Sequence, residues 1–143
     1  MSNPEKRPLR VLCVDDNELM ADALRRRFDQ ESALAWEGTV TQGSLAYDRI
    51  LEVRPDIVLM DIDMPNVDTF TIVERLYCEV PEIRVLMFSG HVSPKDIDRA
   101  LDCGAWGYLS KNDDVTKLID AITRAGRGEL VFSYEVDAVR GNR

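Results

Sequence analysis

The 143-residue sequence is short of several residue types, and each shortage excludes a class of protein. It has a single histidine, His91, and three widely separated cysteines, Cys13, Cys78 and Cys103. Because these residues form neither a paired framework nor a ligand cluster, we expect no disulfide scaffold and no zinc site. No apolar run is long enough for a membrane span, and the N-terminus lacks the hydrophobic segment of a signal peptide. These absences favour a cytoplasmic protein with reduced cysteines.

Positive charge is also scarce, with 18 Lys and Arg against 26 Asp and Glu, for a net charge of −8. We therefore expect neither nonspecific nucleic-acid binding nor membrane binding by this chain. The three consecutive arginines at 25–27 are interpreted as the solvated side of an amphipathic helix. The length predicts one domain over residues 8–128, and we interpret residues 129–143 as a C-terminal tail.

Short apolar runs alternate with helical patterns along the chain. The predicted strands are residues 10–14, 36–41, 57–60, 83–88 and 105–109. The apolar positions of the first and third predicted helices are Leu19, Met20, Ala23, Leu24 and Phe28, then Phe70, Val73 and Tyr77. The run Ile57-Val58-Leu59-Met60 has no polar alternation, which is typical of a strand covered on both faces. The pattern predicts an α/β fold with a doubly wound, five-stranded parallel sheet and helices on both faces.

Polar side chains follow the predicted strands at the points where they end. Asp15 and Asp16 follow the first strand, Asp61 the third, Ser89 the fourth and Lys111 the fifth. Because ligands of open parallel sheets bind at the carboxyl ends of the strands, we expect these residues to form one site. Three close carboxylates repel one another, so the site requires either a cation or a raised pKa.

A hard divalent cation suits this predicted site. Oxygen ligands favour Mg²⁺, which uses few carboxylates and would offset the charge of an incoming phosphoryl group. Lys111 would add a second positive charge, and Ser89 a hydrogen-bond donor to a phosphoryl oxygen. Phosphoryl transfer requires little beyond such positioning and neutralisation.

Four segments carry a family resemblance: "VLCVDDNE", "DIVLMDIDMP", "VLMFSGH" and "CGAWGYLSKND". In this order they resemble the receiver domain of two-component response regulators, over roughly residues 8–128. The resemblance implies a flavodoxin-like fold with strand order 2-1-3-4-5. It also implies a signalling role, with a sensor histidine kinase or a phosphotransfer protein as phosphoryl donor.

The resemblance implies a role for each matched position. Asp61 is the expected phospho-acceptor. Mg²⁺ is expected on Asp15, Asp16, Asp61 and the backbone carbonyl of Asp63. Ser89 is expected to supply the hydroxyl that approaches the phosphoryl group, and Lys111 the ammonium that pairs with it. Tyr108 is the expected aromatic switch residue.

The sequence departs from the family pattern at two loops. Asn112 follows Lys111 where the family usually has proline, and Thr69 replaces a common glycine. Asp63 and His91 occupy variable positions that the resemblance links to phosphoryl lifetime; an acidic Asp63 would either repel the phosphoryl group or orient water. Purely structural roles are the alternative for three of these residues. Asp15 and Asp16 also suit a helix N-terminus, and Tyr108 also suits packing in the core.

The pair Asp61 and Asp63 admits a second interpretation. It resembles the nucleophile and acid of haloacid dehalogenase-type phosphatases, which would make the protein an enzyme. Against this, the pair follows the third strand and Pro65 departs from that motif, so we expect a signalling domain and not an enzyme. The region after Gly128 has no helix-turn-helix pattern, so the protein is either a stand-alone receiver or one whose effector lies beyond these residues. The last helix and strand are candidates for a homodimer contact.

Overall fold

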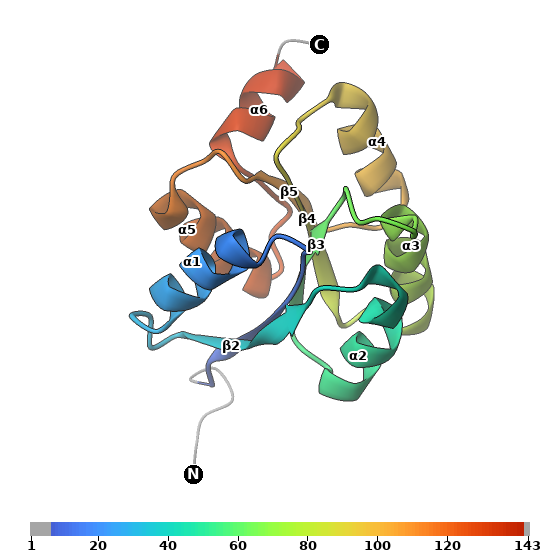
Figure 1. The fold of residues 1–143 in the computed structure, drawn as a ribbon. Helices are drawn as coiled ribbons and strands as arrows, with labels where there is room; N and C mark the ends of the chain where they lie inside the picture. The colour runs from blue at the N-terminus through green and yellow to red at the C-terminus, as the bar shows by residue number, and fades with distance from the viewer. Residues whose placement is uncertain (1–6, 142–143) are drawn as a thin grey trace.

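The computed structural model describes residues 7–141 as a six-stranded parallel sheet, ordered β2-β1-β3-β4-β5-β6, with helices around it (Figure 1). The strands are β1 Leu9–Val14, β2 Leu34–Val40, β3 Ile57–Asp61, β4 Arg84–Ser89, β5 Gly107–Ser110 and β6 Val131–Phe132. The helices are α1 Glu18–Phe28, α2 Ala46–Val53, α3 Thr69–Glu79, α4 Pro94–Asp102, α5 Val115–Gly126 and α6 Tyr134–Gly141, and a 3₁₀ turn, η2, spans Gly43–Leu45. None of the helices in the described range is long and apolar enough to cross a membrane.

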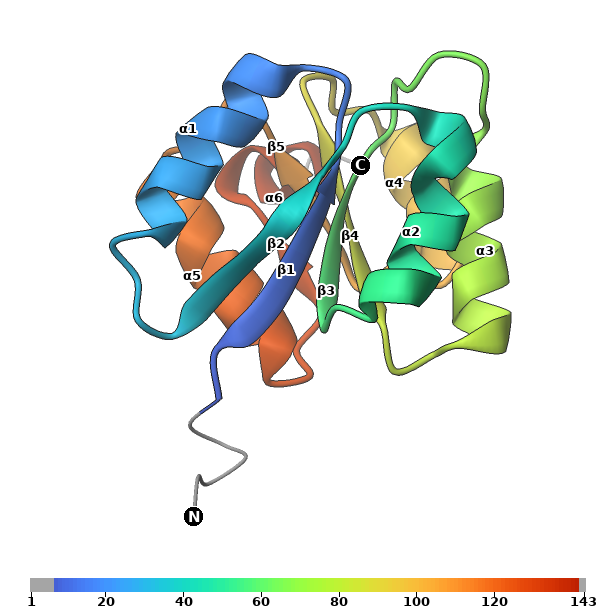
Figure 2. The same ribbon diagram turned by 60° about the horizontal axis from the view of Figure 1, so that its bottom comes forward.

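Alternate residues of each central strand belong to two separate apolar layers. Leu12 and Val58 belong to the layer shared with α2, α3 and α4. Their neighbours Cys13 and Leu59 belong to the layer shared with α1 and α5. Figure 2 shows α1 and α5 on one face of the sheet and α2, α3 and α4 on the opposite face. The structure therefore confirms the predicted parallel α/β sheet with helices on both faces, and it explains why these strands have no polar alternation.

The prediction of five strands and a C-terminal tail is wrong for residues 129–141. Val131 and Phe132 form β6, which pairs in parallel with Gly107 and Tyr108 of β5, and α6 follows. A Cβ atom on Gly107 would lie 2.1 Å from the backbone oxygen of Val131, so β6 requires glycine at that position. A two-residue strand has too little pattern to be detected in the sequence.

Three residues assigned to apolar helix faces, Leu19, Ala23 and Tyr77, lie in solvent instead. The buried stripe of α1 is Ala21, Leu24 and Phe28, whereas Leu19 is 84% exposed. Leu19 lies two positions before Ala21, which is about 200° around a helix. Tyr77 of α3 is 55% exposed and its ring lies over Gly104, where an added Cβ would come within 2.4 Å of it. Tyr77 thus covers a loop glycine and does not contribute to the core.

Candidate functional site

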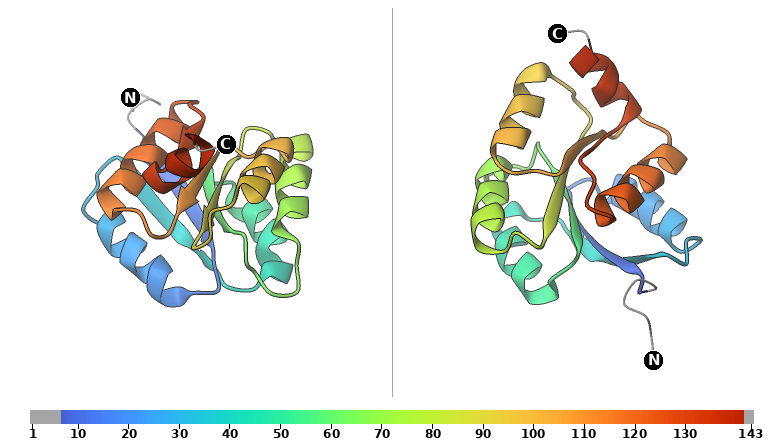
Figure 3. Two further views of the ribbon diagram at one scale, coloured as in Figure 1. Left: turned by 90° about the horizontal axis from the view of Figure 1, so that it is seen from above. Right: turned by 180° about the vertical axis from the view of Figure 1, so that it is seen from behind.

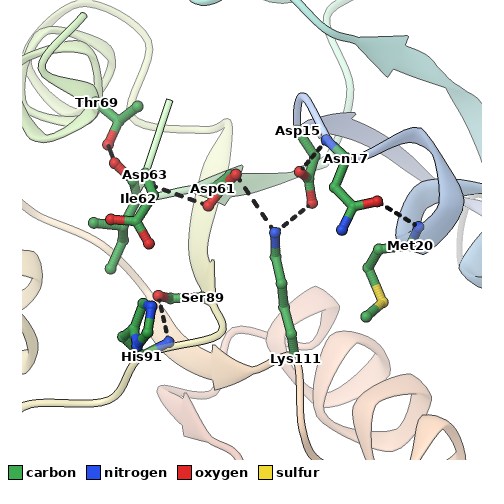
Figure 4. A network of polar contacts seen from close by, with 10 residues as sticks. All are labelled: Asp15, Asn17, Met20, Asp61, Ile62, Asp63, Thr69, Ser89, His91 and Lys111. Carbon is green, nitrogen blue, oxygen red and sulfur yellow. Dashed lines mark hydrogen bonds and ion pairs between the residues drawn. The ribbon is translucent and has the colours of Figure 1, made fainter. Parts of the chain in front are cut away.

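The acidic residues meet where β1 and β3 end side by side. Val14 of β1 is in register with Met60 of β3, so Asp15 and Asp61 follow at adjacent positions. Both are almost fully buried, whereas Asp16 is exposed. One carboxylate oxygen from each of the three lies within 4.8 Å of the others. The predicted acidic cluster is therefore present, and Figure 4 shows Asp15 and Asp61 on either side of Lys111.

Lys111 enters this cluster from the loop after β5. Its Nζ lies 2.7 Å from Asp15 Oδ2 and 3.4 Å from Asp61 Oδ2. The backbone N–H of Lys111 donates to the carbonyl of Ser89 at 2.8 Å, which fixes the loop against the end of β4. The other oxygens of the two carboxylates accept backbone N–H groups: Asp15 Oδ1 from Asn17 at 2.8 Å and Asp61 Oδ1 from Asp63 at 3.1 Å.

Burial and the nearby charges shift the pKa values of two groups in the pocket. Burial, followed by the nearby negative charge of Asp15, raises the pKa of Asp61 to about 6, although the Asp63 N–H and Lys111 act in the opposite direction. Burial alone would lower the pKa of Lys111, but its contacts with Asp15 and Asp61 raise it above the ordinary value. Lys111 thus remains a cation and offsets only part of the negative charge.

The donor set fits a hard divalent cation. Among the described residues, Asp15 Oδ2 has no hydrogen bond of normal geometry beside its ion pair with Lys111, although it is completely buried. Such an oxygen requires positive charge nearby, and Asp16 and Asp61 supply further carboxylate oxygens within reach. Carboxylate oxygens without sulfur or imidazole ligands suit Mg²⁺, which keeps several of its waters. The expected ligand role of the Asp63 carbonyl stays a prediction.

The predicted switch residues lie on the next two strands. Ser89 ends β4 and is buried, and its hydroxyl accepts the backbone N–H of His91 at 3.0 Å. Tyr108 of β5 has no exposed surface, and its hydroxyl donates to the carbonyl of His91 at 2.8 Å. Burial raises the pKa of Tyr108 to about 12, so its hydroxyl remains a donor. Tyr108 therefore points inward, as its packing interpretation also predicts, and its switching role stays a prediction.

The two departures from the family pattern have local structural solutions. The Asn112 backbone N–H donates to Ser110 Oγ at 3.1 Å, and its side-chain amide donates to the carbonyl of Gly90 at 3.2 Å. Thr69 donates its hydroxyl to the carbonyl of Ile62 at 3.2 Å, across the loop after β3. Hydrogen bonds thus hold both loops at the positions where the family usually has proline or glycine.

Sequence reasoning missed the residues that support the Lys111 loop from the C-terminal side. Ser133 Oγ accepts the backbone N–H of Ser110 at 2.8 Å, and Ser110 Oγ donates to Glu135 at 2.6 Å. A weak sequence signal existed, because Ser133 precedes a short pattern with Val136 and Val139 at helical spacing.

This fold and site define a class: a doubly wound, flavodoxin-like α/β protein with an acidic pocket and a lysine at the carboxyl edge of its sheet. The family model of the response regulator receiver domain matches residues 11–123. The chain belongs to this family, as its sequence motifs predict. Receiver domains of two-component systems accept phosphoryl groups on aspartate from histidine kinases.

Relatives and solved structures agree with this assignment. The chain is 31% identical over 135 residues to the response regulator protein VraR of Staphylococcus aureus, covering 94% of this chain and 65% of VraR. A LuxR-family two-component response regulator from Aurantimonas sp. superimposes with a TM-score of 0.87 at 25% identity, covering 95% of this chain and 98% of that one. The receiver domain of the NarL regulator from Mycobacterium tuberculosis superimposes with a TM-score of 0.81 at 27% identity. The match covers 86% of this chain and 99% of that one. The similarity to LuxR-family response regulators is consistent with the resemblance to the DNA-binding-regulator branch of the family.

Proposed function

We propose that Asp61 accepts a phosphoryl group from a histidine kinase or phosphotransfer protein, with Mg²⁺, and that the modified chain presents a changed partner-binding surface. One observation carries this proposal: Asp61 is a buried carboxylate at a strand end, within 4.8 Å of two further carboxylates and 3.4 Å from a lysine. A structural carboxylate in such a position would have more positive charge around it.

Each residue of the site has a distinct task in the proposed transfer. An oxygen of Asp61 attacks the phosphorus while the bond from phosphorus to the donor breaks. Lys111 holds positive charge beside the arriving oxygens, and the Asp63 N–H keeps the Asp61 carboxylate oriented. Bound Mg²⁺ would be held by Asp15, Asp16 and Asp61 and would supply charge that offsets the phosphoryl oxygens.

The proposed change of surface starts at Ser89 and Lys111. New hydrogen bonds from these two side chains to the phosphoryl group would favour one state of a two-state element. Ser89 is buried in the present state, where its hydroxyl accepts the His91 N–H, so reaching the phosphoryl group requires a shift of the β4–α4 loop. Because Tyr108 donates to the carbonyl of His91, the same shift would change its environment.

We infer that the chain is a phospho-acceptor and not a phosphatase with turnover. Asp61 and Asp63 follow β3, a central strand, and Asp63 is exposed, so it has solvent in place of an enclosed leaving-group site. In the phosphatase alternative, Asp63 protonates the leaving group in every cycle. The two functions therefore make opposite predictions for an Asp63→Asn variant.

The test combines intact-mass measurement with a turnover assay. With Mg²⁺ and acetyl phosphate, we expect one added phosphoryl mass on the wild type and on Asp63→Asn, and none on Asp61→Asn. Equal labelling of Asp61→Asn would reject the proposal. Multiple-turnover hydrolysis of small phosphate esters that is lost in Asp63→Asn would establish the phosphatase instead.

A further inference from the structure

The loop that carries Lys111 is joined to helix α6 by residues on both sides of the lysine. Before Lys111, the backbone N–H and hydroxyl of Ser110 bond to Ser133 Oγ at 2.8 Å and to Glu135 Oε2 at 2.6 Å. After Lys111, the Asp113 carboxylate accepts the backbone N–H of Glu135 at 3.1 and 3.3 Å. The first turn of α6 is thus attached to the residues that position the lysine.

The same loop is attached to the phosphorylation site on its other side. The Lys111 N–H bonds to the carbonyl of Ser89, and the Asn112 amide bonds to the carbonyl of Gly90. Lys111 Nζ lies nearer to Asp15, at 2.7 Å, than to Asp61, at 3.4 Å. A phosphoryl group on Asp61 would place new oxygens next to this ammonium and draw it from Asp15, which changes the loop that holds α6.

Helix α6 also covers the strand that carries Tyr108. It lies between α4 and α5 where the sheet ends, as Figure 1 and the two views of Figure 3 agree. Its residue Val136 has no exposed surface and belongs to the same apolar cluster as Tyr108 and Ile97 of α4. Val136 is the one buried residue of α6; Val139 packs against the same cluster but is partly exposed, and Tyr134 is 71% exposed. A helix held by so little apolar surface depends on its polar anchors and opens easily.

We propose that α6 is a built-in output element whose docking is coupled to the chemical state of Asp61. It is docked while Asp61 carries no phosphoryl group, and it is released when the Lys111 loop shifts towards a phosphorylated Asp61. This coupling rests on the proposed function of Asp61. Release would uncover the β5 and α4 surface around Tyr108, at the place where Val136 now lies.

Linkage gives the proposal a second consequence. If phosphorylation releases α6, then weakening the docking of α6 favours the phosphorylated state by the same factor. Loss of the Glu135 side chain removes the acceptor of Ser110 Oγ without touching the metal cluster or Lys111. We therefore expect Glu135→Ala to bind a phosphoryl mimic more tightly than the wild type.

The first measurement is hydrogen–deuterium exchange of the full chain with Mg²⁺, with and without beryllofluoride as the phosphoryl mimic. We expect the amides of residues 133–141 to exchange roughly 5- to 150-fold faster when the mimic is bound, which is the usual range of such coupling. Intact mass after treatment with acetyl phosphate reports separately whether Asp61 is modified. A modified Asp61 with unchanged exchange in α6 would overturn the coupling and leave the proposed function standing. An unmodified Asp61 that also fails to bind the mimic would reject both.

The second measurement is the affinity for beryllofluoride in two matched α6 variants. Asp137 lies on the same helix and carries the same charge as Glu135, but its carboxylate pairs with Arg140 of α6 itself. We expect Glu135→Ala to bind the mimic several-fold more tightly than the wild type and Asp137→Ala to match the wild type. Equal affinities of the two variants, or weaker binding by Glu135→Ala, would contradict the proposal. Ser133→Ala, which removes the acceptor of the Ser110 N–H, repeats the test at an independent anchor.

Discussion

At the amino edge of the sheet, Arg10 and Arg84 each reach the carbonyl end of a helix, whereas at the carboxyl edge Asp15 and Asp61 share Lys111. Arg10 bonds to Glu37 at 2.8 Å and to the carbonyls of Val53 and Arg54, where α2 ends.

Arg84 shows the same arrangement at the end of another helix. It donates to the carbonyls of Ala125 and Gly126 in the last turn of α5, and its guanidinium lies over the ring of Trp106. Cations at the negative ends of helix dipoles are stabilising, so the amino edge is electrostatically matched. The carboxyl edge holds an excess of negative charge instead, and stability does not account for it. The difference indicates that one edge supports the fold, and it agrees with the proposed phosphoryl-acceptor site at the other edge.

The comparison of the two edges predicts its largest effect for Asp61, on the pH dependence of the unfolding free energy. Its folded pKa of about 6 lies above the ordinary value of 3.8, so the folded state binds this proton more tightly than the unfolded state. The free energy of unfolding therefore falls as the pH rises from about 4 to about 6, by about 3 kcal/mol in total at about 1.4 kcal/mol per pKa unit. Without divalent cations, we expect Asp61→Asn to be more stable than the wild type by about this amount at pH 7.5, and nearly equal to it below pH 4.

Urea denaturation in a chelator at several pH values measures this effect. The matched control is Asp56→Asn at the amino edge, where the carboxylate accepts the backbone N–H of Arg10 at 2.9 Å. Because a charged carboxylate accepts this N–H more strongly than an amide oxygen does, the substitution is expected to lower stability and not to raise it. An Asp61→Asn variant that is less stable at all pH values would show that the carboxyl edge is electrostatically matched after all.

A smaller effect of opposite sign is expected at Arg10. The variant Arg10→Met keeps the aliphatic stem but loses three charge-assisted hydrogen bonds, and the side chain is 39% exposed. We expect a loss of about 2 kcal/mol of unfolding free energy, well below the sum for three such bonds, because solvent screens a side chain of this exposure. The carboxyl edge lies about 16 Å away along the strand, so the rate of labelling by acetyl phosphate is expected to stay unchanged. Arg25→Met is the control, because the exposed Arg25–Asp22 pair at 3.7 Å should contribute less than about 1 kcal/mol.

The two edges also differ in how far the sequence could predict them. The acids at the carboxyl edge were predictable because apolar runs such as residues 57–60 fix where strands end, and parallel strands bring those ends together. The cluster of Asp15, Asp16 and Asp61 confirms that reasoning. Two of the three partners of the Arg10 side chain were not predictable, since they are backbone carbonyls more than 40 residues away in the sequence.

The C-terminal part of the fold was missed for a related reason. β6 has two residues, and its place in the sheet depends on the close approach of Val131 to Gly107, which no local pattern reports. The hydrogen bonds of Asn112 to Ser110 and Gly90 are likewise tertiary, so the family's usual proline was the only guide to that loop. Periodicity predicts long elements well, but short elements and loops depend on contacts that only the folded chain defines.

The smallest expected effect is the rise in Tm on binding of Mg²⁺, an ion that supplies the positive charge that the carboxyl edge lacks. An ion that binds only the folded state stabilises it by about 1.4 kcal/mol at ten times its Kd, which corresponds to a rise in Tm of roughly 4 °C for a domain of this size. We expect Mg²⁺ to raise the Tm of the wild type and of Arg10→Met alike. It should have little effect on Asp15→Asn, which lacks one buried carboxylate of the cluster. Thermal unfolding in matched chloride salts of Mg²⁺ and Na⁺ at equal ionic strength separates binding from screening. If Na⁺ raised the Tm equally, or if Asp15→Asn responded like the wild type, the excess negative charge would not be a site for a divalent ion.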